Sequence, residues 1–599
     1  MPGMMNMNKN KAVEKAEKGT FMKSLGKLLK FCKRYWGWII LSMIFGAIAV
    51  VFQIIGPNKI GDIANIITGS FATGIDVGAV TEIAIFLVCI YVAGAILSYF
   101  QQYITATVTQ NTVKRLRQNI SKKINKLPLN YFDTHLHGDI LSRVTNDVDT
   151  IGQNLNQSIG GLVSNTLMFI GVLIVMFVID WIMAFTVVGT TLIGFCISLI
   201  FMTKSQKYFN QNQKNLGDLN AHIEETYSGH NVVQLFNAKE STGKEFAKVN
   251  KKLFSTGWKS QFISGVMMPI MNFVGNLGYV AVCVVGAVLA ANRGIEYYGT
   301  IVEFMIYVRL FTNPLSQIAQ SLTSLQSASA ACGRVFEFLE EKELSDESDK
   351  TLVLENVKGD VEFDHVKFGY NPNKIIIKDF SANVYAGQKI AIVGPTGAGK
   401  TTLVNLLMRF YEINSGDIKI DGVSTKDITR ENVHDLFGMV LQDTWLFEGT
   451  IKENLRYNNP NVTDEQIVEA CKQVGVDHFI QTLSKGYDTV IDDSVNLSAG
   501  QKQLLTIART MIANKPMIIL DEATSSVDTR TEILLQQAMD KAMEGRTSFI
   551  IAHRLSTIKN ADLILVLKDG DIIEKGNHEE LLEKGGFYAD LYNSQFEEV

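Results

Sequence analysis

The sequence predicts an all-α transmembrane domain of six helices with long cytoplasmic helical extensions, followed by a soluble α/β domain. The 599 residues have a positive mean hydropathy of +0.11, and only 20% of them are charged, against about 25% in ordinary globular proteins. The apolar surplus lies in the first half, in spans of about 20 residues, the length that a helix needs to cross a bilayer. After Val361, β-branched strands, glycine turns and helical stretches alternate, which is typical of an α/β domain.

The composition excludes several other classes. The chain is neither collagen-like nor disordered, and its net charge of −5 gives no sign of a nucleic-acid partner. No short apolar segment with a cleavage site opens the sequence, so we expect no removed signal peptide. Six cysteines lie scattered without CxxC spacing and predict neither a zinc site nor a disulfide framework: Cys32, Cys89, Cys196, Cys283, Cys332 and Cys471.

The predicted spans place both chain termini on one side of the bilayer. The six spans are 36–55, 79–104, 159–179, 181–202, 266–291 and 300–319. Lys and Arg are abundant before the first span and in the connections 106–157 and 204–259, and they are scarce in the other three connections. Because cytoplasmic loops carry the excess of Lys and Arg, we expect a multi-pass protein of the plasma (cell inner) membrane with cytoplasmic N- and C-termini.

An amphipathic helix is expected before the first span. Leu25, Leu28, Leu29 and Cys32 recur at helical spacing among lysines, which predicts an elbow helix on the inner membrane face. The chain therefore divides into a cytoplasmic N-terminus 1–34, a transmembrane domain 35–338, an acidic linker 339–359 and an α/β domain 360–599.

A glycine-rich loop follows the strand-like run 389–393 and precedes a helical stretch, which fits GxxxxGK[ST] in its strand–loop–helix setting. Glycines let backbone N–H groups wrap phosphates without Cβ clashes, and the helix N-terminus adds a positive dipole. We expect Lys400 to reach the β- and γ-phosphates of ATP and the Thr401 hydroxyl to bind Mg²⁺. The predicted ATP-binding residues of this loop are Gly394, Pro395, Thr396, Gly397, Ala398, Gly399, Lys400, Thr401 and Thr402.

A second strand-like run ends in two carboxylates, Asp521 and Glu522. Side chains alternate along a strand, so the two carboxylates point in different directions. Asp521 is predicted to hold the Mg²⁺ shell, and Glu522 to act as the catalytic general base toward the attacking water. Without the phosphate loop, acidic residues at a strand end would be interpreted as ordinary helix N-caps.

Between these motifs lies Leu-Ser-Ala-Gly-Gln at 497–501, and with it the second half of the chain resembles the nucleotide-binding domain of ATP-binding cassette (ABC) transporters. The resemblance implies that Tyr370 stacks on adenine and that Gln442 contacts Mg²⁺ and the membrane domain. It also implies a D-loop that contains Asp528 and a catalytic switch histidine, His553. In the family, two cassettes sandwich two ATP molecules, each between one chain's phosphate loop and the other chain's signature. The signature residues are Ser498, Ala499, Gly500 and Gln501.

The whole chain resembles a half-transporter of the ABC exporter family. Residues 131–133 and 138–148 are similar to the family's first intracellular loop, and residues 224–229 to its second. In the family these loops carry short coupling helices that dock on the nucleotide-binding domains.

Two departures from the family pattern concern the dimer. Ala499 stands where the signature LSGGQ has its first glycine, and residues 490–496 lack the Gly-Glu-x-Gly that usually precedes it. The chain thus resembles one subunit of heterodimeric bacterial multidrug exporters, in which one ATP site is competent and the other degenerate. It would supply Asp521 and Glu522 to the competent site. A homodimer that tolerates Ala499 is the alternative.

The expected function is ATP-driven export of amphipathic or hydrophobic small molecules. A homodimeric exporter of lipid or peptide is one alternative, and a cassette-gated channel or regulator is another. Six spans exclude a soluble DNA-repair ATPase, and importers of the family generally carry the membrane domain on a separate chain.

A carboxylate in the last span is the candidate for the substrate cavity. Glu303 and Tyr307 are four residues apart and share a helix face. In exporters of this resemblance the sixth helix lines the pathway, so Glu303 is expected to attract cationic substrates. The alternatives are a carboxylate solvated at the membrane interface and one paired with a basic group on a neighbouring helix.

Overall fold

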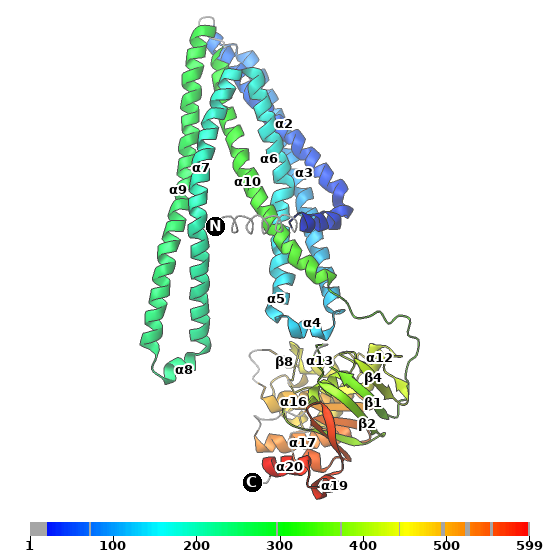
Figure 1. Ribbon diagram of the computed structural model, residues 1–599. Helices are drawn as coiled ribbons and strands as arrows, with labels where there is room; N and C mark the ends of the chain where they lie inside the picture. Colours follow the sequence, from blue (N-terminus) through cyan, green and yellow to red (C-terminus); the bar gives the residue numbers. More distant parts are fainter. Residues whose placement is uncertain are drawn as a thin grey trace. The chain divides into compact units, whose positions relative to one another are not determined.

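The computed structural model describes residues 21–70, 74–294, 297–371, 374–442, 444–492, 497–521, 528–551 and 555–596 (Figure 1). The chain forms two compact units. The helical unit comprises Met1–Asn125 and His137–Glu341, and the α/β unit comprises Lys126–Leu136 and Lys342–Val599. A short piece of the first predicted intracellular loop, 126–136, thus belongs to the α/β unit.

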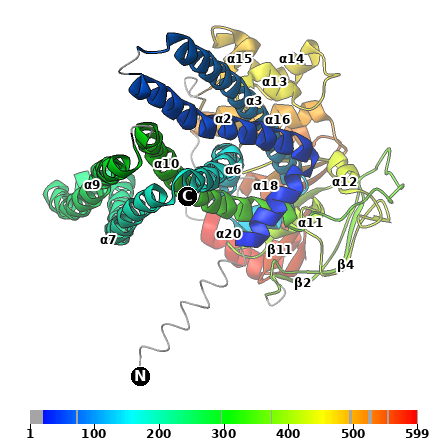
Figure 2. The ribbon, with the colours of Figure 1, turned by 90° about the horizontal axis from the view of Figure 1, so that it is seen from above.

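The helical unit consists of long helices that pack in pairs, with short helical segments between them. After a helix over 21–31 they are η1 (Cys32–Tyr35), α2 (Trp36–Gly69), α3 (Val77–Ile124), α5 (His137–Ser142), the π-helical η2 (Arg143–Asp147), α6 (Val148–Ile179), α7 (Trp181–Ser228), α8 (His230–Leu235), α9 (Lys239–Arg293) and α10 (Tyr298–Glu340). α2 packs along α3, α6 along α10, and α7 along α9 (Figures 1 and 2). The short α8 joins the lower ends of α7 and α9 (Figure 1).

Among the described residues, five helices are long and apolar enough to cross a membrane. They are Phe21–Gly69, Val77–Ile124, His137–Ile179, Trp181–Ser228 and Asn272–Arg293. The sixth predicted span, 300–319, does form a helix, but α10 does not reach the same apolarity because it carries residues such as Glu303 and Arg309. α10 contacts α2, α6 and α9, and these neighbours cover polar side chains that lipid would not tolerate.

The predicted elbow helix is present over residues 21–31, but its apolar face is only partly buried against the rest of the protein. Leu28 and Cys32 are buried, whereas Leu29 is half exposed. The Ser329 hydroxyl of α10 donates a hydrogen bond to the carbonyl of Phe21 at 3.0 Å. The helix is therefore held to α10, and its placement on the inner membrane face stays a prediction.

The α/β unit contains two main sheets. Its strands are β1 (Val361–Phe368), β2 (Ile377–Val384), β3 (Lys389–Val393), β4 (Ser415–Ile420), β5 (Val423–Ser424), β6 (Phe437–Val440), β7 (Gly449–Thr450), β8 (Val490–Ile491), β9 (Met517–Asp521), β10 (Thr547–Ile551), β11 (Leu563–Lys568) and β12 (Asp571–Gly576). An antiparallel sheet has the order β2-β1-β4-β5. The larger sheet has the order β12-β11-β3-β10-β9-β6 and is parallel except at β12.

The α/β unit also contains helices. They are α4 (Leu129–Thr134), α11 (Lys400–Leu407), α12 (Arg430–Leu436), α13 (Ile451–Arg456), α14 (Asp464–Gln473), α15 (Asp477–Thr482), η4 (Gly486–Asp488), α16 (Ala499–Ala513), α17 (Thr529–Met543), α18 (Leu555–Lys559), α19 (His578–Glu583) and α20 (Phe587–Phe596). The strand side chains alternate between two buried cores: Ile390 and Ile392 of β3 face one, and Ala391 and Val393 face the other. A strand buried on both faces is apolar at every position, as in parallel sheets generally.

The order of the parallel strands positions the functional residues. β3 and β9 both flank β10 and run parallel to it, so their carboxyl ends meet at one edge of the sheet. The phosphate loop follows β3, and Asp521 is the last residue of β9. Ligands of open α/β sheets bind at this edge.

Candidate nucleotide-binding site

The phosphate loop has the predicted strand–loop–helix geometry. β3 ends at Val393, and α11 begins at Lys400. Gly399, which precedes α11, has φ 103°, a conformation that residues with a Cβ seldom adopt. At Gly394 a Cβ would lie 2.2 Å from the carbonyl oxygen of Leu567. Both positions therefore require glycine, and the loop is free to present N–H groups to an anion at the start of α11.

Lys400 points back into this loop. It is 9% exposed, and its Nζ donates hydrogen bonds to the carbonyl oxygens of Gly394 at 2.6 Å and Pro395 at 3.2 Å. Burial lowers the pKa of the Lys400 ammonium, and the charge of the Asp521 carboxylate acts in the opposite direction. The lysine is held where phosphate oxygens can replace the two carbonyl groups.

The predicted metal ligands offer only oxygen atoms. Thr401 supplies a hydroxyl, Gln442 an amide carbonyl after β6, and Asp521 a carboxylate that is 7% exposed. Mg²⁺ prefers such hard ligands and keeps most of its shell for water and substrate phosphates. Across the described residues no group of three or more His, Cys, Asp or Glu side chains forms a cluster.

Glu522 and His553 lie outside the described residues, and their roles stay predictions. The strands that lead to them are described. Ile551, the last residue of β10, is the register partner of Asp521 in β9. The chain therefore leaves both strands at neighbouring points of the same sheet edge.

Tyr370 lies in a cluster of aromatic rings. Its ring packs edge-on against Phe368 and Tyr411, with centroids 5.0 and 4.8 Å away. Its hydroxyl donates a hydrogen bond to Thr402 Oγ1 at 3.3 Å, which ties the tyrosine to α11. Tyr370 remains 40% exposed, so one face of the ring is available to an adenine.

Tyr411 is a further residue of this site, and no sequence motif predicts it. Its hydroxyl donates a hydrogen bond to the carboxylate of Asp133 in α4, the helix of the first intracellular loop. Burial, followed by this hydrogen bond, raises the pKa of Tyr411 above its ordinary value. Within the α/β unit, Tyr411 therefore connects the ring predicted to stack on adenine with α4. No pattern in a single sequence identifies this contact, because Asp133 and Tyr411 are separated by 278 residues.

The signature residues begin a helix, as predicted. Ser498 is the N-cap of α16, and Ser498 and Gln501 form a capping box, in which each side chain accepts a hydrogen bond from the other's backbone N–H. Ala499 and Gly500 occupy the first turn, whose N–H groups have no partner within a helix. These N–H groups can donate hydrogen bonds to a phosphate bound by another chain.

Asp528 begins another helix. Its carboxylate accepts a hydrogen bond from the Thr531 N–H at 3.1 Å and caps α17. Hydrogen bonds from Thr531 hold the pKa of Asp528 below its ordinary value. The rest of the predicted D-loop lies outside the described residues.

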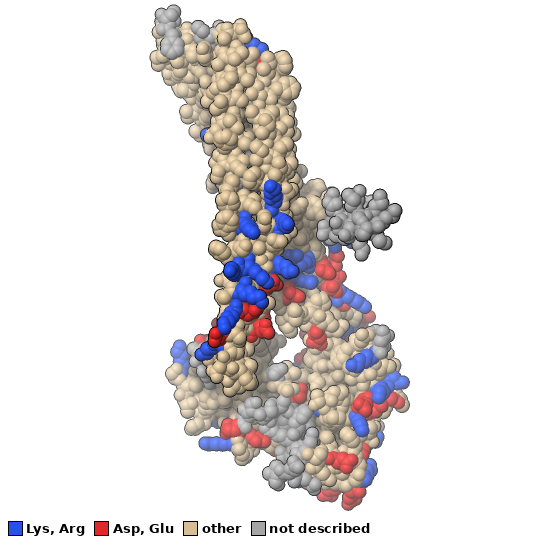
Figure 3. Space-filling view, turned by 60° about the vertical axis from the view of Figure 1, so that its left-hand side comes forward, with Lys and Arg blue, Asp and Glu red and all other residues tan. Residues whose placement is uncertain are grey.

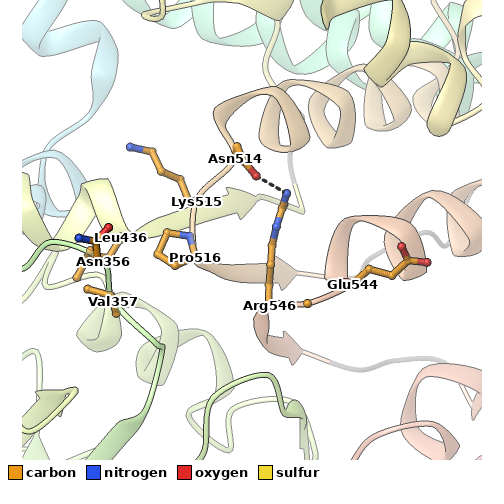
Figure 4. Close-up of a pocket in the computed structure, with 9 residues that line it drawn as sticks. Asn356, Val357, Leu436, Asn514, Lys515, Pro516, Glu544 and Arg546 are labelled. Carbon is orange, nitrogen blue, oxygen red and sulfur yellow. Dashed lines mark hydrogen bonds between the residues drawn. The ribbon is translucent and has the colours of Figure 1, made fainter.

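A separate pocket of the α/β unit lies at the opposite sheet edge (Figure 4). It has a volume of about 460 Å³, and the Arg546 guanidinium in it donates a hydrogen bond to the Asn514 side chain at 3.0 Å. Leu436, Pro516 and Arg546 line it, and they directly precede β6, β9 and β10. It therefore lies at the amino ends of the strands, away from the phosphate loop.

Family models match both units of the chain. A model of the ABC transporter transmembrane region matches residues 39–315, and a second model, described as ABC transporter, matches residues 377–525. Full-length relatives extend the match. A fatty acid ABC transporter ATP-binding/permease protein of Mycobacterium bovis is 45% identical over 540 residues, which are 90% of this chain and 85% of that protein.

The chain belongs to the ABC transporter family. Two Bacillus subtilis relatives agree: the ABC transporter ATP-binding protein YfiC is 41% identical over 98% of this chain and 96% of its own length, and the probable multidrug resistance protein YheH is 34% identical over 85% and 77%. The predicted resemblance and fold class are confirmed. This transporter is a multi-pass membrane protein that couples ATP hydrolysis to transport, with both parts fused in one chain.

The two residues predicted in the substrate cavity contact α2 in this structure. Tyr307 is fully buried, and its hydroxyl donates a hydrogen bond to the carbonyl of Ile54 at 3.0 Å. Glu303 is 5% exposed, and Asn58 Nδ2 donates to its Oε1 at 3.4 Å. A Cβ on Gly61 of α2 would lie 2.2 Å from that oxygen, so only glycine permits this approach. In this structure Glu303 is therefore covered by α2 rather than exposed at the surface.

Proposed function

We propose that this transporter exports amphipathic or hydrophobic small molecules, as the subunit that carries the catalytic glutamate of a heterodimer. The names of its relatives support this substrate class, since one is described as a fatty acid transporter and another as a probable multidrug resistance transporter. The distribution of Lys and Arg supports cytoplasmic termini and a plasma-membrane location. Residues 35–338 and 360–599 remain our proposed domain limits, joined by the linker 339–359.

An exposed apolar patch carries the proposal of a second subunit. The patch comprises Tyr227, Val232, Leu235 and Phe236, in and beside α8, and these side chains are 83%, 59%, 76% and 73% exposed. α8 has no buried residue. Soluble surfaces seldom expose such clusters unless they bind a partner. The other loop helix, α4, belongs to the α/β unit and is held there by the hydrogen bond from Tyr411 to Asp133. We assign α8 to the nucleotide-binding domain of the partner.

The proposed chemistry uses this chain's own groups at the sheet edge. Glu522 accepts a proton from the water that attacks the γ-phosphorus, while the bond from phosphorus to the β,γ-bridging oxygen breaks. Lys400 and the N–H groups of the loop neutralise the developing charge on phosphate oxygens. His553 holds the γ-phosphate, and Asp521, Thr401 and Gln442 would hold Mg²⁺. When bound, Mg²⁺ supplies electrostatic stabilisation of the phosphates.

Coupling follows from where ATP binds. ATP between one chain's phosphate loop and the partner's signature favours the closed pair of nucleotide-binding domains, and hydrolysis removes that preference. In the proposed heterodimer, this chain supplies Glu522 to the competent ATP site. Its signature residue Ala499 therefore faces the partner's phosphate loop at the weak ATP site.

Ala499→Gly is expected to leave ATP turnover of the heterodimer within about twofold of the wild type, because the substitution lies at the weak site. A twofold change in rate corresponds to less than about 0.5 kcal/mol in the activation free energy. In a homodimer both sites would contain Ala499, and turnover would change several-fold. The measurement is steady-state ATPase activity of the purified complex. A chain expressed alone that forms a stable homodimer with full, substrate-stimulated ATPase would contradict the heterodimer.

A pathway role for Glu303 and Tyr307 requires α2 and α10 to separate during the cycle, because both side chains are covered by α2 here. The second oxygen of Glu303, Oε2, is buried without a hydrogen-bond partner among the described residues, which leaves it available to a ligand when the helices part.

Glu303→Gln is therefore expected to reduce transport of a cationic substrate selectively, while a neutral substrate and basal ATPase are unchanged, because only the charge is removed. Transport assays with one cationic and one neutral probe measure this difference. Tyr307→Phe, measured in the same assays, shows the effect of losing a contact with α2 without a change of charge. Equal transport of both probes by Glu303→Gln would remove Glu303 from the pathway.

A further inference from the structure

A basic pocket lies within the helical unit where the elbow helix meets α3 and α10. It has a volume of about 700 Å³ and is lined by Lys27, Lys30, Phe31, Lys33, Arg34, Arg115, Phe336 and Glu340. Phe31 and Phe336 form an apolar wall, with ring centroids 6.0 Å apart in an edge-to-face arrangement. The lining combines five cations with one carboxylate, so a strong positive charge surrounds an apolar wall.

Two of the five cations already have partners. Lys27 Nζ forms an ion pair with Glu340 at 2.6 Å, and the Arg115 guanidinium lies 4.7 Å from the centre of the Phe31 ring. For Lys30, Lys33 and Arg34, no ion pair forms with any described residue. Three cations in one pocket repel one another, and an anion would relieve that repulsion.

The pocket lies at the level where the membrane surface is expected. Directly after it, Trp36 and Trp38 begin α2 and are 49% and 57% exposed. Exposed tryptophans are typical of the membrane–water interface. The Trp36 indole N–H donates to the carbonyl of Leu29 at 3.2 Å, which fixes the ring beside the elbow helix.

Lipid-facing side chains continue from this level along α2. Ile40, Ile44, Ile48 and Val51 recur at helical spacing and are 39% to 52% exposed. In the helical unit the upper part of the surface is almost free of charge, and Lys and Arg gather below it (Figure 3). A phosphate group in the pocket would therefore have room for acyl chains along α2.

We propose that this pocket binds the phosphodiester headgroup of an anionic phospholipid. Lys30, Lys33 and Arg34 bind the phosphate, Phe31 and Phe336 contact the glycerol backbone, and the acyl chains lie along the exposed face of α2. The assignment of this lipid to the cytoplasmic leaflet rests on the proposed cytoplasmic orientation of the N-terminus. The binding itself does not depend on that orientation. Each lysine or arginine near an anionic lipid surface contributes about five-fold to affinity.

Native mass spectrometry of the purified full chain tests the proposal, because it counts bound lipid without any need for transport. The probes are phosphatidylglycerol, phosphatidylcholine and inorganic phosphate. We expect phosphatidylglycerol to bind at least about five-fold more tightly than phosphatidylcholine. The combined variant Lys30→Gln, Lys33→Gln and Arg34→Gln is expected to abolish that preference.

The matched control replaces Lys248, Lys251 and Lys252 of α9 by glutamine, which changes the net charge equally on exposed residues of the same unit. It is expected to retain the preference. An unchanged preference in the pocket variant would overturn the proposal, as would an equal loss in the control. Binding of inorganic phosphate that displaces phosphatidylglycerol at equal concentration would assign the pocket to free phosphate instead.

Discussion

Glu522→Gln is expected to lower ATP turnover by about 100-fold or more while ATP binding is retained, because glutamine keeps the shape of the side chain but cannot accept the proton of the attacking water. The nucleotide would then hold the two nucleotide-binding domains together, so the variant is also expected to accumulate a closed dimer. Steady-state ATPase activity measures the first effect, and retention of labelled nucleotide on the purified complex measures the second.

The neighbouring carboxylate provides the contrast for this experiment. Asp521→Asn is expected to weaken Mg²⁺-dependent nucleotide binding, since Asp521 is the protein carboxylate among the proposed metal ligands. Glu522→Gln is not expected to weaken it. Turnover of Glu522→Gln within about twofold of the wild type would contradict its assignment as general base, because such a change is far smaller than a general base contributes.

Lys400→Met is expected to reduce turnover by on the order of 100-fold, comparable to the loss of one donor that stabilises transition-state charge. It should also weaken ATP binding about ten-fold or more, since a charge-assisted hydrogen bond is lost. The methionine retains the apolar stem of the lysine but leaves the carbonyl groups of Gly394 and Pro395 without their donor. ATPase kinetics and equilibrium binding of a fluorescent ATP analogue measure the two effects.

Lys419→Met is the matched control for this substitution. Lys419 lies on β4 and pairs with Glu362 at 3.3 Å, away from the sheet edge that carries the phosphate loop. It is expected to leave ATP affinity unchanged. Equal losses in Lys400→Met and Lys419→Met would indicate a general destabilisation of the domain rather than the loss of a phosphate ligand.

The local parts of the nucleotide site were predictable from the sequence. β3 ends at Val393 and α11 begins at Lys400, as the glycine pattern predicts, because backbone conformation there depends on residues only a few positions apart. Ser498 and Gln501 cap α16 for the same reason, since a capping box is a contact over three residues. The apolar run 517–520 predicts the buried strand β9, whose last residue is Asp521.

Contacts between distant segments were not predictable in the same way. The hydrogen bond from Tyr411 to Asp133 and the basic pocket that joins Lys30 to Arg115 and Phe336 depend on how separate helices pack. Glu303 shows the same limit: its spacing to Tyr307 identifies the helix face, but not that Asn58 and Gly61 of α2 cover it. A single sequence does not indicate which helix surfaces pack against one another.

ATP-dependent uptake into inside-out vesicles tests the central claim, ATP-driven export, most directly. Vesicles that contain the transporter and its partner are supplied with a labelled fatty acid or amphipathic drug, with ATP or with a non-hydrolysable analogue. We expect accumulation above the external concentration with ATP but not with the analogue, and loss of that accumulation in Glu522→Gln. Equilibration without accumulation, equal with ATP and with the analogue and unaffected by Glu522→Gln, would contradict a pump and indicate a gated channel.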